Sequence, residues 1–481
     1  MPKNINTSVT TATKWSAVTE IVAKLVTPVT SMVLAHLLTP EAFGVVTTLT
    51  MIISFAEIFT DAGFQKYLVQ HEFADDIDRE QSTNVAFWSN FVVSLIIWGV
   101  ISVFADPLAK LVGNPGLGHV LTVACISIPL AAFSSIQMAL YRRALDFKTL
   151  FKVRIASIVV PLVVTVPLAL WFRNYWALVI GTITQNAVNA VFLTLFSKWK
   201  PRLYYSFRKL HEMLSFTVWS LVEAISIWLT GYLDVFIVGT MLSQHYLGLY
   251  KTSIALVGSI MAIITSATTP VLFSSLSRLQ NDETEFKRLF FKFQKLVGLL
   301  VIPIGVGIFC YSNLLTDLLL GSQWAEASGF IGLWGLTSSV TIILSHYSSE
   351  VYRAKGRPKL SVLAQWLHII VLLPTVLLAV QHGFEPLCIA RSFVRLELVA
   401  VNMVIMYTIV HISFPQMIRN IVPSCLSALV IVAVSYSTPF ISTNAIWQII
   451  SIILCAMAYI SVIYIFPEER SVMQRYILKR K

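Results

Sequence analysis

The chain has 481 residues, of which 56% are hydrophobic and 12% are charged, and its mean hydropathy is +0.76. Soluble domains carry about twice that charged fraction, so this composition excludes a soluble protein. The formal net charge of +11 requires no nucleic acid, because the anionic headgroups of an inner leaflet supply the counter-charge. The sequence therefore predicts a membrane protein with membrane lipids, and not nucleic acid, as partners.

Fourteen apolar segments follow one another along the chain, each about as long as one bilayer crossing, which needs roughly 20 residues. The predicted fold is thus an all-α polytopic membrane protein with 14 transmembrane helices. We expect these helices near residues 15–37, 44–64, 82–104, 118–140, 153–172, 175–197, 213–240, 247–272, 289–311, 328–351, 360–381, 386–410, 416–438 and 444–466.

The basic residues lie mostly on one side of this arrangement. Twenty-nine of the 35 lysines and arginines belong to that side, which leaves Lys110 and Arg173 in loops of the other side and four within helices. Cytoplasmic loops retain Lys and Arg during insertion. The pattern predicts a multi-pass protein of a bacterial inner membrane with both termini in the cytoplasm.

An internal repeat organises the predicted helices. A shift of 204 residues places Trp15 on Trp219 and Gly44 on Gly248. Each repeat holds six helices, and because six is even, the two bundles are related by a pseudo-twofold axis along the membrane normal. Bundles related in this way enclose a central cavity whose opening alternates between the two sides.

The repeat also predicts the domain boundaries. Residues 1–205 form an N-terminal six-helix bundle and residues 206–412 a C-terminal one. Residues 413–481 add transmembrane helices 13 and 14 and a basic cytoplasmic tail. The basic stretch at 198–212 is the linker between the two bundles.

Four short stretches carry a resemblance to a known family: residues 38–44 (LTPEAFG), 61–64 (DAGF), 68–70 (LVQ) and 141–148 (YRRALDFK). With the layout of six, six and two helices, they resemble Wzx-type polysaccharide transporters of the multidrug/oligosaccharidyl-lipid/polysaccharide exporter superfamily. The exopolysaccharide and colanic-acid type is the most similar. The resemblance implies a flippase that moves an undecaprenyl-diphosphate-linked oligosaccharide from the cytoplasmic to the periplasmic leaflet for O-antigen, capsule or exopolysaccharide assembly. Other polysaccharide-assembly proteins are partners that it suggests.

Cations within the membrane segments are the first candidate site residues. A charged side chain at the bilayer centre costs about 2.5–3.5 kcal/mol on insertion scales, so Lys24, Arg391 and Arg395 need a partner or a wet cavity. In a transporter of the implied architecture, they would meet the diphosphate or acidic sugars of the substrate. The alternative is neutralisation within the protein, of Lys24 by Glu20 one helical turn away and of Arg395 by Glu397 or an acid on another helix.

Acidic and uncharged polar residues complete the candidate site. Glu20, Glu223 and Asp234 are candidates for exchanging a coupling cation, either H⁺ or Na⁺. The sixth predicted helix carries Gln185, Asn186 and Asn189, of which the side chains suit sugar hydroxyls. Hydrogen bonding between helices is the alternative explanation of these amides.

The sequence contains no motif for metal binding, nucleotide binding or catalysis. The five cysteines stand alone, without the spacing of a metal site, and no phosphate-binding loop is present, so we expect no metal, no cofactor and no catalytic residues. Two rival functions remain. A multidrug/cation antiporter of the same superfamily would more typically have twelve helices, and a membrane polysaccharide polymerase or ligase would need a large periplasmic loop with catalytic Arg or His.

Overall fold

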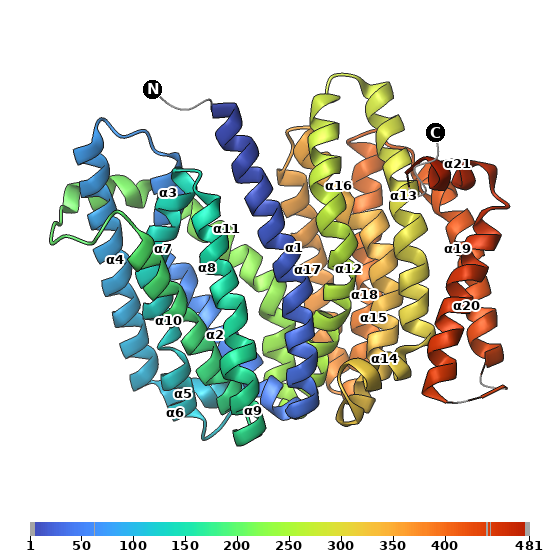
Figure 1. The fold of residues 1–481 in the computed structure, drawn as a ribbon, viewed down its shortest axis with the longest axis horizontal. Coiled ribbons are helices and arrows are strands. Elements are labelled where there is room, and N and C mark those ends of the chain that lie inside the picture. Colours follow the sequence, from blue (N-terminus) through green and yellow to red (C-terminus); the bar gives the residue numbers. More distant parts are fainter. Residues whose placement is uncertain (1–4, 62, 439–440, 443, 477–481) are drawn as a thin grey trace. The chain divides into compact units, whose positions relative to one another are not determined.

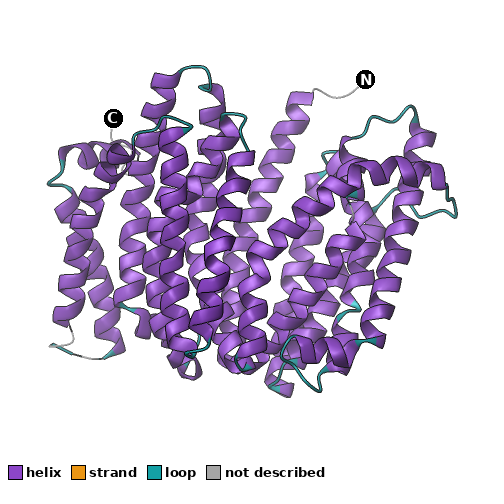
Figure 2. Cartoon of the chain, turned by 180° about the vertical axis from the view of Figure 1, so that it is seen from behind, coloured by secondary structure: helices purple, strands orange, loops and turns teal. Residues whose placement is uncertain are grey.

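The computed structural model describes residues 5–61, 63–438, 441–442 and 444–476. The described chain is helical throughout, and no strand occurs in it (Figure 2). The contacts divide the protein into two compact units, Met1–Gly248 and Leu249–Lys481, called unit 1 and unit 2 below. The predicted boundaries at 205 and 412 and the two-bundle arrangement stay predictions.

Unit 1 contains the elements up to the start of the helix that leads into unit 2 (Figure 1). Its elements are α1 (Ile5–Leu37), α2 (Pro40–Asp61), α3 (Phe64–Gln70), α4 (Asp76–Val103), α5 (Ala105–Leu111), α6 (Gly118–Ala124), α7 (Ser127–Arg143), α8 (Phe147–Val160), the π-helix η1 (Pro161–Thr165), α9 (Val166–Phe172), α10 (Trp176–Phe196) and α11 (Phe207–Met241). Helix α12 (Gln244–Arg278) begins in unit 1 and continues into unit 2.

The described elements of unit 2 are also all helices. Its remaining elements are α13 (Glu283–Cys310), α14 (Ser312–Leu319), the 3₁₀-helix η2 (Ser322–Ala327), α15 (Ser328–Thr341), the π-helix η3 (Ile342–His346), α16 (Tyr347–Ala354), α17 (Lys359–Val380), α18 (Phe384–Thr408), α19 (Phe414–Ser437), α20 (Ala445–Ile463) and α21 (Pro467–Tyr476). Helix α13 packs against both α15 and α19, and α20 packs on α19. The pair α19 and α20 runs antiparallel, and the short α21 follows it at one end (Figure 1).

Helices form at all fourteen predicted segments. Twelve of them are long and apolar enough to cross a membrane within the described residues, so the protein is a multi-pass membrane protein. The two others are α1, which has a shorter apolar stretch at Val22–Leu37, and α18, which carries Arg391, Arg395 and Glu397. The count of fourteen crossings and the side on which the termini lie stay predictions.

Several predicted helices are interrupted. The segment at 153–172 is split by η1, which begins at Pro161, and Pro167 follows at the start of α9. Proline has no N–H to donate to the preceding turn, so two such residues within seven positions loosen the helical hydrogen bonding there. The segment at 328–351 contains a second π turn, η3, for which no proline is the cause.

Small residues allow close helix packing inside unit 2. A Cβ added to Gly305 of α13 would lie 2.5 Å from the Cβ of Ser339, and one added to Gly335 of α15 would lie 2.4 Å from Ile308. Neither position tolerates a larger residue without a shift of the helices. Such interfaces are typical of membrane helices, which associate through close packing because lipid tails offer no hydrophobic contrast.

The starts of α2 and α12 cross within unit 1. A Cβ on Gly44 would lie 1.9 Å from the carbonyl oxygen of Gln244, and a Cβ on Gly248 would lie 1.8 Å from the carbonyl oxygen of Pro40. Real Cβ contacts are never that short, so only glycine fits at either position. The two backbones are therefore in direct contact.

Polar side chains close the region around this crossing. Nδ1 of His245 lies 2.6 Å from Oε1 of Glu41. The side chain of Gln244 accepts a hydrogen bond from Thr48 Oγ1 at 3.2 Å and donates one to the Gly113 carbonyl at 2.9 Å. These contacts fix the α2 and α12 starts to each other and to the loop after α5.

Candidate functional site

A partly open cavity with polar and apolar lining residues lies in unit 1. Its volume is about 420 Å³, and α2, α3, α4, α7, α10 and α11 all contribute to its wall. The lining residues are Ser54, Glu57, Ile58, Thr60, Gly63, Gln65, Lys66, Asn90, Ala131, Ala132, Ser134, Ser135, Met138, Asn186, Asn189, Leu221 and Ala224. Both a carboxylate and an ammonium group therefore face a space within the helical bundle.

Amide side chains shape this cavity. Asn90 of α4 is fully buried and donates to Ser135 Oγ at 2.7 Å, while its own Oδ1 has no hydrogen-bond partner among the described residues. Asn189 of α10 accepts a hydrogen bond from Ser157 of α8. A buried amide oxygen without a partner costs free energy, so the cavity offers an acceptor to water or to a bound hydroxyl group.

The predicted sugar contacts are partly brought together here. Asn186 and Asn189 both line the cavity, whereas Gln185, their neighbour in α10, is not among the lining residues. Contact of any of the three with sugar stays a prediction. The alternative also has support at Asn189, because Ser157 bonds to it between helices.

The predicted charged residues of unit 1 lie on α1 and α11. Lys24 is half-buried on α1 and makes no ion pair with the described side chains. Asp234 is 4% exposed on α11, and its Oδ1 accepts the Val235 N–H at 2.8 Å. The side chains of Glu20 and Glu223 lie outside the described part of the structure. The predicted ion pair between Glu20 and Lys24 therefore also lies outside it.

Two arginines form the centre of a polar cluster in unit 2. Arg391 and Arg395 project from α18, one turn apart, and their guanidinium carbons lie 5.0 and 3.8 Å from the ring centroid of Trp334. Arg391 Nε donates to Tyr250 Oη at 3.0 Å, and Arg395 donates to Ser338 Oγ at 2.8 Å. A guanidinium stacked on an indole ring gains cation–π energy of up to about 2 kcal/mol when desolvated.

A histidine and a glutamate stand beside these arginines. Nδ1 of His368 on α17 lies 2.9 Å from Oε2 of Glu397 on α18. The sequence left open that Glu397 neutralises Arg395, in place of a role for Arg395 in substrate binding. Glu397 instead contacts His368, and Arg395 is held by Trp334 and Ser338, which are uncharged.

The three predicted cations thus fall in different parts of the protein. The structure brings Arg391 and Arg395 together within unit 2, while Lys24 belongs to unit 1. A shared cationic cavity made by all three stays a prediction.

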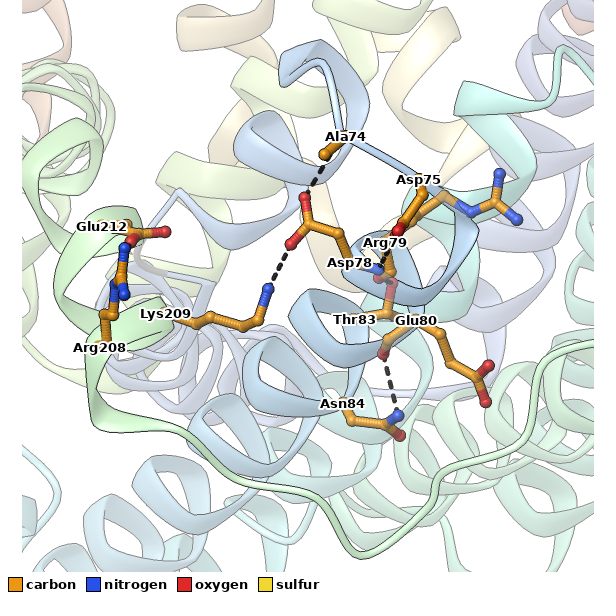
Figure 3. Close-up of polar contacts among 10 residues, drawn as sticks. All are labelled: Ala74, Asp75, Asp78, Arg79, Glu80, Thr83, Asn84, Arg208, Lys209 and Glu212. Atoms are coloured by element: carbon orange, nitrogen blue, oxygen red, sulfur yellow. Dashed lines mark hydrogen bonds and ion pairs between the residues drawn. The ribbon is translucent and has the colours of Figure 1, made fainter.

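The basic end of unit 1 is held by ion pairs and backbone contacts. Lys209, near the start of α11, reaches Asp78 near the start of α4, and the Asp78 carboxylate also accepts the Ala74 N–H at 3.2 Å (Figure 3). Arg143 donates to the carbonyls of Leu68 and His71 at 2.8 and 2.7 Å. Arg143 therefore caps the last turn of α3.

The linker after α10 is fixed to α4 by the same kind of contact. Arg202 pairs with Glu80 at 2.8 Å, its backbone N–H donates to Asn84 Oδ1 at 2.8 Å, and its carbonyl accepts from Trp88 Nε1 at 2.9 Å. A second cavity of about 900 Å³ lies at this end, lined by residues of both signs that include Arg79, Glu80 and Lys198. Most of the basic residues at this surface have internal partners.

Sequence reasoning missed several residues that the structure places in these sites. Asn90 and Ser135 offered a signal, because a buried amide and hydroxyl within apolar segments need partners. Trp334 and His368 offered none, since each contacts residues about 30 to 60 positions away in the sequence and only the packing of α15, α17 and α18 brings them together.

Comparisons with known proteins identify what this arrangement is similar to. The family model described as "Polysaccharide biosynthesis protein" matches residues 33–329. The succinoglycan biosynthesis transport protein ExoT of Rhizobium meliloti is 25% identical over 70% of this chain and 67% of its own length. The lipopolysaccharide biosynthesis protein WzxC of Escherichia coli is 21% identical over 65% of this chain and 63% of its own length.

Among solved structures, the lipid II flippase MurJ in an inward closed conformation has a similar fold. Its TM-score is 0.74, with 13% sequence identity over 94% of this chain and 98% of that one. At this identity the likeness concerns the fold alone.

Proposed function

This chain belongs to the polysaccharide biosynthesis protein family, and from that premise we propose that it flips a lipid-linked oligosaccharide across a bacterial inner membrane. The substrate is an undecaprenyl-diphosphate-linked oligosaccharide that moves from the cytoplasmic to the periplasmic leaflet, for assembly of O-antigen, capsule or exopolysaccharide. The family match over residues 33–329 is the observation that carries the proposal. The names of the relatives, a succinoglycan transport protein and a lipopolysaccharide biosynthesis protein, support it.

The crossing of α2 and α12 supports alternating access through two repeats. Gly44 contacts Gln244, and Gly248 contacts Pro40. A shift of 204 residues turns position 40 into 244 and position 44 into 248, so each contact is the repeat equivalent of the other. The Glu41–His245 contact joins a position to its own equivalent, since 41 and 245 also differ by 204. A self-complementary contact of this kind is what a twofold axis requires, and it favours an axis that passes between the starts of α2 and α12.

This crossing is the proposed periplasmic gate of the transporter. The charge pattern assigns the loops before α2 and α12 to the side poor in Lys and Arg. Direct backbone contact at Gly44 and Gly248 leaves no space for a sugar headgroup between these helix starts. In the proposed cycle the contact is made while the substrate enters from the cytoplasm and breaks when it leaves.

The polar groups within the units have proposed roles in the same cycle. Lys24, Arg391 and Arg395 attract the diphosphate, because a doubly charged headgroup needs cationic partners away from water. Asn186 and Asn189 offer hydrogen bonds to sugar hydroxyls from the cavity in unit 1. Glu20, Glu223 and Asp234 remain candidates for the coupling cation.

Deletion of the gene tests this function. We expect loss of surface polysaccharide and accumulation of its lipid-linked precursor on the cytoplasmic leaflet, measured in inverted vesicles with a membrane-impermeant sugar-oxidising label. A plasmid copy should restore both. Normal polysaccharide in the deletion strain, together with raised sensitivity to cationic drugs, would instead assign the protein to the multidrug antiporters.

A further inference from the structure

His368 and Glu397 form an ionisable pair inside the membrane-spanning part of unit 2, beside the two arginines at Trp334. His368 lies near the middle of α17, and Glu397 lies near the middle of α18. Their side chains are 8% and 24% exposed and meet at 2.9 Å. Because the carboxylate oxygen accepts, Nδ1 of the imidazole is the donor, and Nε2 is the nitrogen with a free lone pair.

Charged groups around this pair lie on α18 and α16. The charged groups that face His368 are Glu397, Arg391 and Arg395, all from α18. Helix α16, which also packs on α17, contributes Glu350 and Arg353, and these two pair with each other at 2.5 Å. With a neutral imidazole the cluster on α18 holds two cations and one anion, and a protonated imidazole adds a third cation.

Packing alone does not explain an ionisable pair at this place. Buried ion pairs commonly stabilise no more than well-packed apolar residues of the same size. Ionisable side chains within membrane segments are costly and mark ion or proton pathways. Imidazole is the side chain that exchanges a proton near neutral pH.

A metal ion is a weaker explanation of the same geometry. No group of three or more His, Cys, Asp or Glu that could hold a metal occurs in the part of the chain that the structure describes. The nearest further charged groups are guanidiniums, which have no lone pair to donate to a metal. A proton needs only the one free nitrogen of His368.

We propose that His368 and Glu397 form a proton-binding site of this transporter, in addition to the candidate acids on α1 and α11. A proton from water binds the Nε2 lone pair of neutral His368 and gives an imidazolium, which the Glu397 carboxylate stabilises through Nδ1–H. Release returns the proton to water and restores the neutral imidazole. Glu397 is the more exposed member of the pair and therefore the end of the site nearer to its surroundings.

The arginines link this proton to the anionic substrate. A diphosphate held near Arg391 and Arg395 offsets their positive charge and so favours the imidazolium at His368. By thermodynamic reciprocity, protonation of His368 then strengthens binding of the diphosphate by the same factor. This step rests on the proposed function, whereas proton binding itself does not.

The first experiment tests proton binding without substrate. The full chain is placed in lipid nanodiscs with isotope-labelled histidine, and the ring signals of its nine histidines are followed between about pH 5 and 8. The signal that disappears in His368→Asn should titrate in that range, and Glu397→Gln should move its midpoint. A His368 signal that keeps one protonation state over the whole range overturns the proposal.

The second experiment tests coupling. Proteoliposomes carry lipid-linked oligosaccharide extracted from the deletion strain, and the rate of flipping is measured with and without a pH gradient. The gradient should stimulate the wild type and the control His382→Asn, a change at the exposed end of α17, but not His368→Asn or Glu397→Gln. Stimulation that persists in His368→Asn overturns the proposal. A wild type that moves no lipid contradicts the proposed function alone, because the titration still decides the proton site.

Discussion

Trp334 orders the interior of unit 2 by holding two guanidinium groups against one ring. The ring is 5% exposed, and Arg391 and Arg395 reach it at 5.0 and 3.8 Å. The planar guanidinium stacks on an aromatic face in a way that the compact ammonium of lysine cannot match. Trp334 therefore contributes to holding both arginines within the protein.

Lys24 differs from these arginines, because it is half-buried on α1 and pairs with no described carboxylate. We expect Lys24→Ala to reach the membrane in normal amounts but to lower polysaccharide export about tenfold or more, which corresponds to 1.4 kcal/mol. Lys24→Arg should retain export. Surface polysaccharide and protein level are measured in the deletion strain.

The control for this change is Lys110→Ala, at an exposed position outside the proposed site. It should leave export unchanged. Full export by Lys24→Ala would remove Lys24 from the proposed diphosphate contacts and leave Arg391 and Arg395 as the candidates.

Gly44 and Gly248 are the positions at which one methyl group should matter most. We expect Gly44→Ala or Gly248→Ala to destabilise the described conformation by about 1–3 kcal/mol or more, the cost of overpacking, because the new Cβ meets a backbone carbonyl at under 2 Å. The matched control is Gly258→Ala, also on α12, where nothing lies within 4 Å. Melting temperatures in detergent measure the difference, and equal values for Gly248→Ala and Gly258→Ala would contradict the crossing.

Helices α4 and α11 are joined at the basic end by Lys209 and Asp78, of which the side chains are 17% and 28% exposed. Less screening by water makes the coupling between the charges of a partly buried pair stronger than in a surface pair, for which the median is about 0–1 kcal/mol. It fixes the start of α11, which follows the linker from α10. The start of α11 is thus attached to α4 before the helix enters the membrane.

A double-mutant cycle measures this attachment. Asp78→Asn and Lys209→Met should each lower the stability of the protein, and the double change should cost less than the sum of the two, with a coupling of about 1 kcal/mol. The same cycle at Arg208 and Glu212, of which the side chains are 91% and 52% exposed, should show almost none. Equal coupling in the two cycles would mean that the Asp78–Lys209 pair does not fix α11.

Helix α21 is held on α13 by Lys295, which pairs with Glu468 and with Glu469 at 3.3 Å. The hydrogen bond from Lys295 lowers the pKa of Glu468 below its ordinary value of 4.5. A carboxylate with a lowered pKa stabilises the attached state of α21 at any pH above its ordinary pKa. This stabilisation is lost as the pH falls through the lowered pKa.

We therefore expect α21 to detach more readily in acid. The protection of the backbone amides in α21, expressed relative to their intrinsic exchange rate at each pH, should fall below about pH 4, while the amides of α20 stay protected. Lys295→Met should lower the protection of α21 at neutral pH as well. Protection of α21 that is independent of both pH and Lys295 would contradict the role of this pair.

The positions of the helices could be predicted from hydropathy, because the length of a bilayer crossing sets the period of the apolar segments. The interruptions could not. The π-helix η3 arises within residues 336–355, which contain neither proline nor glycine, so no helix-breaking residue marks it. Pro129, just after the turn at Cys125–Ile126, and Pro161 are the exceptions, since a proline within a helix is a visible signal.

The candidate site was predictable only where one helix carries it. Asn186 and Asn189 share a helix face, and both line the cavity. The contacts of Glu397 were not predicted, because its nearest candidate partner in the sequence was Arg395 on the same helix, whereas the packing of α17 supplies His368. Contacts between helices depend on their rotation, which periodicity leaves undetermined when both faces are apolar.

The orientation of the whole chain is the remaining large-scale prediction. The 29 basic residues on one side predict that the C-terminus is cytoplasmic, which requires an even number of crossings. A green fluorescent protein fused after Lys481 should fluoresce, and alkaline phosphatase fused there should be inactive. The reverse result would mean an odd number of crossings and would break the six-plus-six-plus-two layout.

The glycine crossing also offers a way to control the conformation of the protein. Backbone atoms form the contact at Gly44 and Gly248, so no side chain can rotate away to make room for a Cβ at either position. A larger residue at Gly248 removes the stability of the closed crossing without touching the charged groups of either unit. Under the proposed periplasmic gate at this crossing, a substitution at Gly248 should hold the protein open toward the periplasm, and an outward state should be easiest to capture with it.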